Sequence, residues 1–220
     1  MEIYPKLITN VETQEYVAAL TFDDGPHPLY TPLVLDILAK HKAKATFFMV
    51  GEAASKYPAI VKRVATEGHS IGNHSWNHPN LQKLRFRYSR LKQLWACEHA
   101  ISPYGKRLFR PPFGMENRQI RIDSALFFYK VILWNTSAQD WVPQHSDEIA
   151  HKIYKRAKPG SIFLLHDAIY ADLADDILDR KPMLDGLEKA LSDLRGQIRF
   201  VTVPELLQAG KPVCNWPLKC

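Results

Sequence analysis

The chain has no long hydrophobic run. None of its apolar stretches approaches the roughly 20 residues that a membrane-spanning helix needs, so we expect no integral membrane segment. Its first residues, Met1–Asn10, include charges and Pro5 and lack the basic start and apolar middle of a signal peptide. The sequence as it stands favours a cytoplasmic protein, or an exported one from which a leader was removed, and leaves the compartment open.

Cysteine is scarce. The three cysteines are Cys97, Cys214 and Cys220, an odd number whose spacing fits no zinc-binding motif. Cys214 and Cys220 bound a short segment, CNWPLKC, that a disulfide can close in an oxidising compartment. Free thiols explain the same residues equally well, so both readings stay open.

Runs of one charge are also absent. The 29 Lys and Arg residues outnumber the 23 Asp and Glu residues, giving a net charge of +6, but they are scattered along the chain. No segment resembles a basic nucleic-acid-binding arm, and we therefore predict no nucleic-acid partner. There is no internal repeat, low-complexity tract or linker. We predict a single catalytic domain over residues 1–220, with a core at about 17–203 and a tail at 204–220.

Short apolar runs alternate with stretches of helical spacing. The runs predict strands at Val17–Phe22, Ala45–Val50, Ser70–Ile71, Leu108–Arg110, Tyr129–Trp134, Ser161–Leu165 and Arg199–Thr202. Strands separated by helices indicate parallel βαβ units. We expect an α/β fold, a distorted and incomplete (β/α) barrel with about seven parallel strands. An open doubly wound sheet is the alternative. The acidic stretch Ala168–Met183 is expected to form a surface excursion.

Polar residues gather where the predicted strands end, the edge at which α/β proteins form their sites. Asp23 and Asp24 follow the apolar run Val17–Phe22 directly. Two carboxylates there are costly unless each has a partner, although a solvated Asp-Gly turn explains the pair as well. His74 and His78 are four residues apart, so both rings can reach one cation or simply lie on the surface. One carboxylate and two imidazoles form a common set of ligands for a catalytic divalent ion.

Three further strand ends carry notable residues. Arg110 precedes two prolines and can hold a carboxylate or a phosphate, or lie on the surface. Asp140 adjoins Trp141 in the segment Trp134–Trp141. His166 ends an apolar strand, where a lone histidine is more often structural than catalytic.

Together these segments resemble the polysaccharide deacetylase family, carbohydrate esterase family 4. Its five motifs occur here in order: TFDDGP at 21–26, H-S-x-x-H-P at 74–79, R-P-P-F at 110–113, Asp-Trp at 140–141 and L-x-H at 164–166. The resemblance covers about residues 17–167. It implies a metal-dependent N-deacetylase that releases acetate from an N-acetylglucosamine-type polymer or oligomer, using a metal-activated water.

The resemblance also implies roles for individual residues. It makes Asp24, His74 and His78 ligands of one divalent metal ion, zinc in the first place, with cobalt or another first-row ion as alternatives. It makes Asp23 the general base, held by Arg110, and His166 the general acid, supported by Asp140. Substrate contacts fall to Leu164, which lines the acetyl pocket, and to the backbone N–H near Phe113. Apart from the resemblance, Trp76, Trp141 and Tyr170 are candidates for stacking on a sugar, with buried packing as the equal alternative.

One position departs from the family pattern. The fourth motif commonly reads D-x-x-D-W, whereas Ser137 stands at its first position here. The change matters little if Asp140 is the partner of His166, and it affects the acid or the substrate contacts if the earlier position is used.

Three other functions use similar residues. Non-haem iron oxygenases bind metal through two histidines and a carboxylate, but usually on an all-β scaffold. Hydrolases of non-sugar amides and a binding module without turnover are the other two. Peptidoglycan, chitin oligomers, an exopolysaccharide and a lipid-linked sugar all remain candidate substrates, and the oligomeric state stays open.

Overall fold

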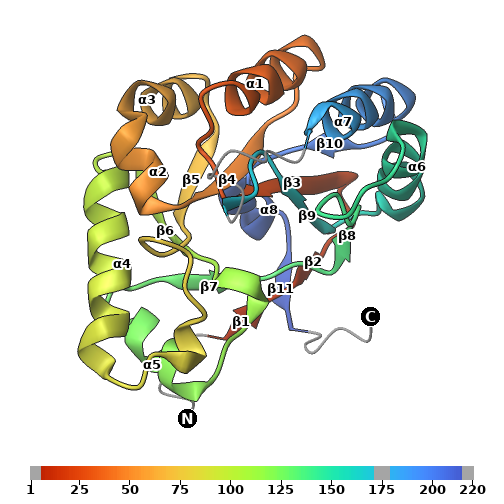
Figure 1. The fold of residues 1–220 in the computed structure, drawn as a ribbon. Helices are drawn as coiled ribbons and strands as arrows, with labels where there is room; N and C mark the ends of the chain where they lie inside the picture. The colour runs from red at the N-terminus through yellow and green to blue at the C-terminus, as the bar shows by residue number, and fades with distance from the viewer. Residues whose placement is uncertain (1–5, 171–178, 215–220) are drawn as a thin grey trace.

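The computed structural model describes residues 6–170 and 179–214, and it is built on one curled sheet of parallel strands (Figure 1). The strands run in the order β1-β7-β6-β5-β4-β3-β9-β8, and β10 pairs with the start of β3. Every pairing in this sheet is parallel. Its strands are β1 (Leu7–Ile8), β3 (Val17–Asp23), β4 (Ala45–Met49), β5 (Ser70–Asn73), β6 (Gly105–Phe109), β7 (Lys130–Ile132), β8 (Thr136–Ser137), β9 (Ile162–His166) and β10 (Arg199–Phe200).

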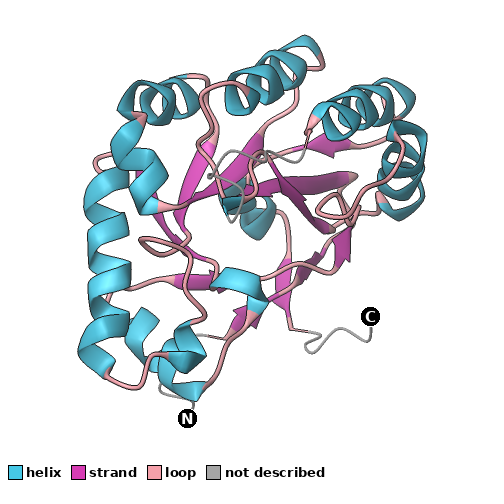
Figure 2. Cartoon of the chain, viewed as in Figure 1, coloured by secondary structure: helices cyan, strands magenta, loops and turns pink. Residues whose placement is uncertain are grey.

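Helices surround the outer face of the sheet (Figure 2). They are α1 (Tyr30–Lys40), α2 (Gly51–Lys56), α3 (Pro58–Thr66), α4 (Arg87–Ile101), α5 (Arg118–Ala125), α6 (Ser146–Arg156) and α7 (Lys181–Asp193), with 3-10 turns η1 (Leu81–Lys83) and η2 (Pro112–Gly114). The short helix α8 (Val203–Gln208) starts with a capping box between Thr202 and Glu205, and Val203 and Leu206 join the inner core. This arrangement confirms the distorted (β/α) barrel that the sequence predicts.

The alternation of side chains along β3 decides which of them enter the barrel. Leu20 and Phe22 pack outward in the core under the helices, whereas Val17 and Ala19 belong to the inner cluster. Side chains alternate between the two faces of a strand, so Asp23 lies on the inner face with Val17 and Ala19. The strand thereby delivers a carboxylate to the inside of the barrel at its C-terminal edge.

The same period of two places Arg110 and His166. Phe109 packs outward among the apolar residues near α4 and α5, so the next residue, Arg110, turns inward and is fully buried. Phe163 and Leu165 pack outward in the larger core, so His166 turns inward at the end of β9. Three separate strands thus point polar side chains at one interior.

Gly72 in β5 leaves space for the Phe48 ring, on which Arg110 rests. A Cβ at Gly72 would lie 2.6 Å from the ring of Phe48. Phe48 belongs to the inner cluster, and the Arg110 guanidinium lies 4.1 Å from the centre of its ring. A larger residue at position 72 would therefore displace the ring on which Arg110 rests.

All seven predicted strands are present, and the structure adds four that the sequence did not predict. The short strands β1 and β8 extend the sheet at its two edges. β2 (Asn10–Glu12) and β11 (Lys211–Val213) form a separate antiparallel pair.

Several expectations concern residues outside the described ranges. Cys220 and residues 171–178 are among them, so the choice between a Cys214–Cys220 disulfide and free thiols stays open. The described ends of the expected surface excursion differ from the prediction, because Ala168, Arg180 and Met183 are buried and helix α7 begins at Lys181. Among the helices that the structure describes, none has the length and apolar character that crossing a bilayer requires.

Candidate active site

Five segments meet at the C-terminal edge of the sheet, where they enclose a pocket of about 480 Å³. Predicted site residues form most of its wall, and Arg110 and Asp140 lie buried behind that wall. The lining consists of Asp23, Asp24, His74, Asn77, His78, Phe113, Gly114, Trp134, Trp141, Leu164, His166, Ile169 and Tyr170. Asn77, Gly114, Trp134 and Ile169 were not predicted as site residues from the sequence.

The three predicted metal ligands come together at one wall of the pocket. Asp24 Oδ1 lies 3.4 Å from His74 Nε2 and 3.3 Å from His78 Nε2. Ligands at about 2.0–2.1 Å from a tetrahedral zinc ion are separated from each other by about 3.3–3.4 Å. Both distances from Asp24 Oδ1 match this spacing, and all three ligand atoms lie within 4.8 Å of one another.

Hydrogen bonds and burial orient these groups for a metal ion. His74 Nδ1 lies 2.7 Å from the carbonyl oxygen of Arg110, which can only accept, so Nδ1 donates to it and the ring turns Nε2 toward Asp24. Burial, with a smaller effect of His74, lowers the pKa of His78 to about 4, leaving a neutral ring. Burial opposes ionisation of Asp24, but His74, His166 and His78 outweigh it and lower the pKa of that carboxyl.

One oxygen of the Asp24 carboxylate accepts a backbone hydrogen bond, and the other lies next to His74 and His78. The backbone N–H of Tyr170 donates to Oδ2 at 3.1 Å. Oδ1 is buried and has no hydrogen-bond partner among the described residues. A buried oxygen without a partner is costly, and a cation placed between Asp24, His74 and His78 would remove that cost. The residues present thus fit a divalent metal ion.

The loop His74–His78 is held from two sides. The side chain of Gln93 in α4 accepts from the backbone N–H groups of Trp76 and Asn77. On the other side, the first N–H groups of α2, from Gly51 and Glu52, donate to carbonyls of the loop. These contacts stabilise His78 at a φ of 53°, a left-handed conformation that costs a histidine about 1–2 kcal/mol.

Asp23 is anchored by Arg110. The Arg110 Nη1 atom lies 2.7 Å from Asp23 Oδ1 and 2.7 Å from Thr21 Oγ1. Its Nε and Nη2 atoms donate to the carbonyl oxygens of Ile132 and Leu133, so the guanidinium is fixed on all sides. Asp23 Oδ2 remains on the pocket side, 3.7 Å from His74 Nε2. One carboxylate oxygen is thus immobilised, and the other faces the predicted metal ligand His74.

His166 and Asp140 form a second buried pair. Asp140 Oδ1 lies 3.1 Å from His166 Nδ1, and Asp140 Oδ2 accepts from the backbone N–H of His166 at 2.8 Å. Burial alone would lower the pKa of His166, but the Asp140 carboxylate, with help from Asp24 and Asp23, raises it to about 9. His166 is therefore protonated at neutral pH.

Arg180 is a site residue that the sequence did not reveal. It is 2% exposed and donates through Nη2 to Asp140 Oδ2 and to the His166 carbonyl oxygen at 2.7 Å. Its Nη1 atom donates to the Asp140 carbonyl oxygen at 2.7 Å. Arg180 begins a helix that no motif marks, so no pattern in the sequence connects it to Asp140.

The predicted substrate residues lie around the mouth of the pocket. Leu164 is buried in its wall, while Trp141 and Phe113 are 41% and 59% exposed. Phe113 has a φ of 60° and follows two prolines, which have no N–H. Among the described residues, no carbonyl accepts from the Phe113 N–H, so this donor is free. Tyr170 also lines the pocket, with its ring 5.9 Å from that of His78.

Trp76 and Ser137 lie apart from the pocket lining. Trp76 packs against α2, where its ring contacts Gly51, so it is not a stacking surface in this pocket. Ser137 Oγ accepts from the backbone N–H of Gln139 and supports the turn before Asp140. Among the described residues, Asp140 is the carboxylate that pairs with His166, so the departure at Ser137 leaves that pair intact.

Comparison with known proteins identifies the family. The sequence model described as "Polysaccharide deacetylase" matches residues 10–131. The chain belongs to the polysaccharide deacetylase family. This membership confirms the enzyme class predicted from the sequence, a hydrolase of a non-peptide amide bond.

Relatives with named substrates resemble this deacetylase over most of its length. A peptidoglycan-N-acetylglucosamine deacetylase of Bacillus cereus is 37% identical over 209 residues, covering 90% of this chain and 91% of the relative. A chitooligosaccharide deacetylase of Azorhizobium caulinodans is 37% identical over 172 residues, covering 76% and 80%. The crystal structure of the Bc1960 peptidoglycan N-acetylglucosamine deacetylase superposes with a TM-score of 0.83 at 33% identity, covering 96% of this chain and 97% of that one.

Proposed function

We propose that this deacetylase removes the acetyl group from N-acetylglucosamine-type residues of a glycan, with a divalent metal ion held by Asp24, His74 and His78. The observation that carries the proposal is that this triad lines the same pocket as Asp23 and His166. These two residues are register partners on the neighbouring strands β3 and β9. A base and an acid therefore project from adjacent strands into the same pocket.

The ligand set favours zinc. It combines one carboxylate with two imidazoles at tetrahedral spacing and leaves a coordination position open, which is typical of catalytic zinc sites. When bound, such an ion polarises a carbonyl oxygen and makes a neighbouring water more acidic.

Asp23 is the proposed general base. Attack on the amide carbon requires that a water molecule lose a proton, and Asp23 Oδ2 is the carboxylate oxygen left free beside the ligands. Arg110 keeps Asp23 in position through its hydrogen bond to Oδ1. The free N–H of Phe113 is the proposed donor to the oxyanion that forms on the former carbonyl oxygen.

His166 is the proposed general acid. The amine leaves only after its nitrogen gains a proton, and protonated His166 can donate one from Nε2 because Nδ1 is held by Asp140. Transfer of this proton completes hydrolysis: the C–N bond breaks, acetate is released and a free amine remains on the sugar.

The walls of the pocket suit an acetamido sugar. Leu164 provides an apolar surface for the acetyl methyl group, and Trp141 and Tyr170 offer aromatic faces at the mouth. The named substrates of the relatives, peptidoglycan N-acetylglucosamine and chitooligosaccharide, both carry this group.

The test is to count products on defined substrates. Purified protein is incubated with N-acetylglucosamine oligomers and with peptidoglycan, and released acetate and new amines on the glycan are both quantified. We expect equal amounts of the two products, and none from glucose oligomers or in the Asp24→Ala variant. A wild-type protein with bound metal that releases no acetate from any N-acetylated glycan would contradict the proposal.

A further inference from the structure

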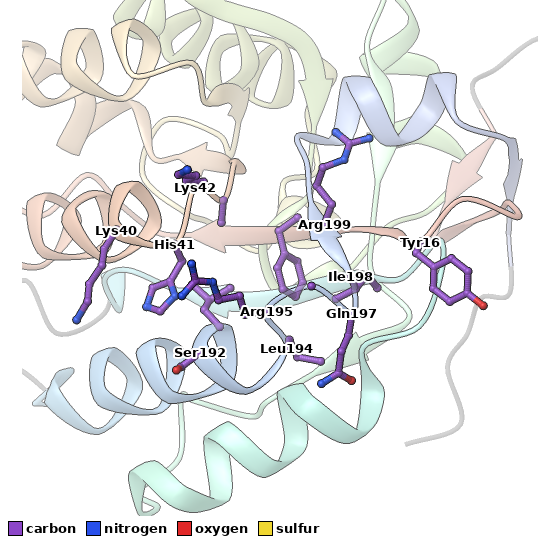
Figure 3. A pocket seen from close by; sticks show the side chains of 14 residues that line it. Tyr16, Lys40, His41, Lys42, Ser192, Leu194, Arg195, Gln197, Ile198 and Arg199 are labelled. Carbon is purple, nitrogen blue, oxygen red and sulfur yellow. The ribbon is translucent and has the colours of Figure 1, made fainter.

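A second cavity lies at the opposite edge of the sheet. It has a volume of about 620 Å³ and sits where β3, β4 and β10 begin, between the end of α1 and the connection from α7 to β10. Figure 3 shows Lys40 at one end of it and Tyr16 at the other. We call this cavity the basic hollow. Its position separates it from the catalytic pocket, which opens at the C-terminal ends of the strands.

The basic hollow is lined by cations without matching carboxylates. Lys40, Lys42, Arg195 and Arg199 line it, and no described lining residue is Asp or Glu. Lys40 pairs with Glu188, and Arg199 reaches Glu15 only at 4.0 Å. Within residues 6–170 and 179–214, no ion pair involves Lys42 or Arg195. At least two positive charges are therefore available to a ligand.

His41 adds a buried polar atom to this charge. Its Nε2 is buried and has no hydrogen-bond partner among the described residues. Burial lowers the pKa of His41, Glu188 partly opposes this effect, and the charges of Lys40 and Arg195 add to it. A buried polar atom without a partner is unfavourable, and an oxygen of a bound anion would supply the missing partner.

We propose that the basic hollow binds a sugar that carries a phosphate group. Arginine and lysine are the side chains that bind phosphate best, and the pair Lys42 and Arg195 matches the double charge of a phosphate monoester. The cavity is larger than phosphate alone requires and lies in the size range of small-molecule sites.

The remaining lining suits the sugar. Tyr16 is 72% exposed at the end of the hollow opposite Lys40, so its ring is available to a pyranose face. Ala43, Leu194 and Phe200 form an apolar floor. The expected ligand is thus a monosaccharide phosphate, with its anion near His41 and its ring towards Tyr16.

The experiment titrates the whole protein with glucose 6-phosphate, inorganic phosphate and glucose in 0.15 M salt, observed by NMR and calorimetry. We expect saturable binding of glucose 6-phosphate, weaker binding of inorganic phosphate and none of glucose. Resonances of His41, Gly196 and Gln197 should move.

Loss of two charged contacts in Lys42→Ala/Arg195→Ala should weaken binding at least about tenfold. Tyr16→Ala should weaken the sugar phosphate and leave inorganic phosphate unchanged.

The matched control is Arg118→Ala/Lys155→Ala, which removes the same charge from two exposed residues outside the hollow. It should bind as the wild type does. Equal loss in both double variants, no saturable binding, or shifts confined to the catalytic pocket would overturn the proposal. Deacetylation should be unchanged in every variant of the basic hollow. If the wild-type protein released no acetate, that result would contradict the proposed function but not the proposed binding of a sugar phosphate.

Discussion

At the scale of single residues, three buried carboxylates share one design. In each, a fixed donor holds one oxygen, and the other oxygen faces a histidine of the site. The donors are Arg110 for Asp23 Oδ1, the Tyr170 N–H for Asp24 Oδ2, and Arg180 for Asp140 Oδ2. A carboxylate held in this way cannot rotate, so its free oxygen has a defined position before substrate arrives. Such preorganisation reduces the reorganisation that the reaction requires.

The first prediction concerns Asp23. Asp23→Asn keeps the shape of the side chain and removes the proton acceptor, so kcat should fall by roughly 10²–10⁴-fold. Bound metal, measured by mass spectrometry of the native protein, should be unchanged, because the three ligand residues are intact. Asp36→Asn, on the exposed face of α1, is the matched control and should retain wild-type kcat. Normal turnover in Asp23→Asn would mean that another group accepts the proton.

The second prediction concerns the acid and uses its pKa of about 9. An acid works only while it is protonated, so kcat should fall as pH rises through the pKa of His166. Asp140→Asn removes the anion that raises this pKa, and the basic limb of the kcat profile should move to lower pH. An unmoved basic limb would show that Asp140 does not support the acid.

Substitution of Arg180 should move the basic limb in the opposite direction to Asp140→Asn. Arg180→Gln removes a cation beside the His166 pair, so imidazolium is less disfavoured and the basic limb should move to higher pH. A merely structural role for Arg180 would lower kcat without moving the limb. Opposite shifts in the two variants would show that Asp140 raises the pKa of His166 and that Arg180 lowers it.

At the scale of elements, the sequence predicts the strands that carry long apolar runs. β3 and β9 are buried on both faces, so they appear as continuous hydrophobic stretches, and the polar residues after them mark the site. β1 and β8 have two residues each, too few for any periodicity to show. Their pairing depends on neighbours that only the folded sheet provides.

The predicted site follows the same rule. Their positions at strand ends made Asp23 and His166 candidates, and the resemblance to the polysaccharide deacetylase family supplied their roles. Arg180 lies at the start of a helix and meets Asp140 across 40 positions of sequence. Contacts of this kind depend on how a helix packs against the barrel, and no local pattern encodes that packing.

The third prediction concerns the support of Arg110 by neighbouring strands. Gly72→Ala should destabilise the fold by about 1–3 kcal/mol, because the new Cβ would meet the Phe48 ring at 2.6 Å. Urea unfolding measures this change. Because Phe48 carries Arg110, kcat should fall as well.

A double variant tests the cause. In Gly72→Ala/Phe48→Leu, the leucine is smaller than the phenylalanine ring and leaves space for the new Cβ. Gly72→Ala should therefore reduce the free energy of unfolding less in the Phe48→Leu background than in the wild type. Additive costs would mean that the two positions do not interact and that the destabilisation has another origin.

At the scale of the whole molecule, metal binding should be coupled to stability. Asp24 follows β3, and His74 and His78 follow β5, so the ligands meet only in the folded barrel. Zinc at a hundredfold excess over its dissociation constant should add about 2.7 kcal/mol, or roughly 5–10 °C in Tm for a chain of this size. His78→Gln should abolish most of this shift. An equal zinc-induced shift in that variant would place the ion elsewhere.

The central claim is that this pocket performs metal-dependent deacetylation of a glycan. The most direct measurement is acetate release from N-acetylglucosamine oligomers by one protein sample before chelation, after complete removal of metal, and after zinc is added back. We predict release, then its loss, then its recovery in proportion to the zinc bound, with none recovered in the Asp24→Ala variant. Undiminished acetate release from the verified metal-free protein would contradict the account.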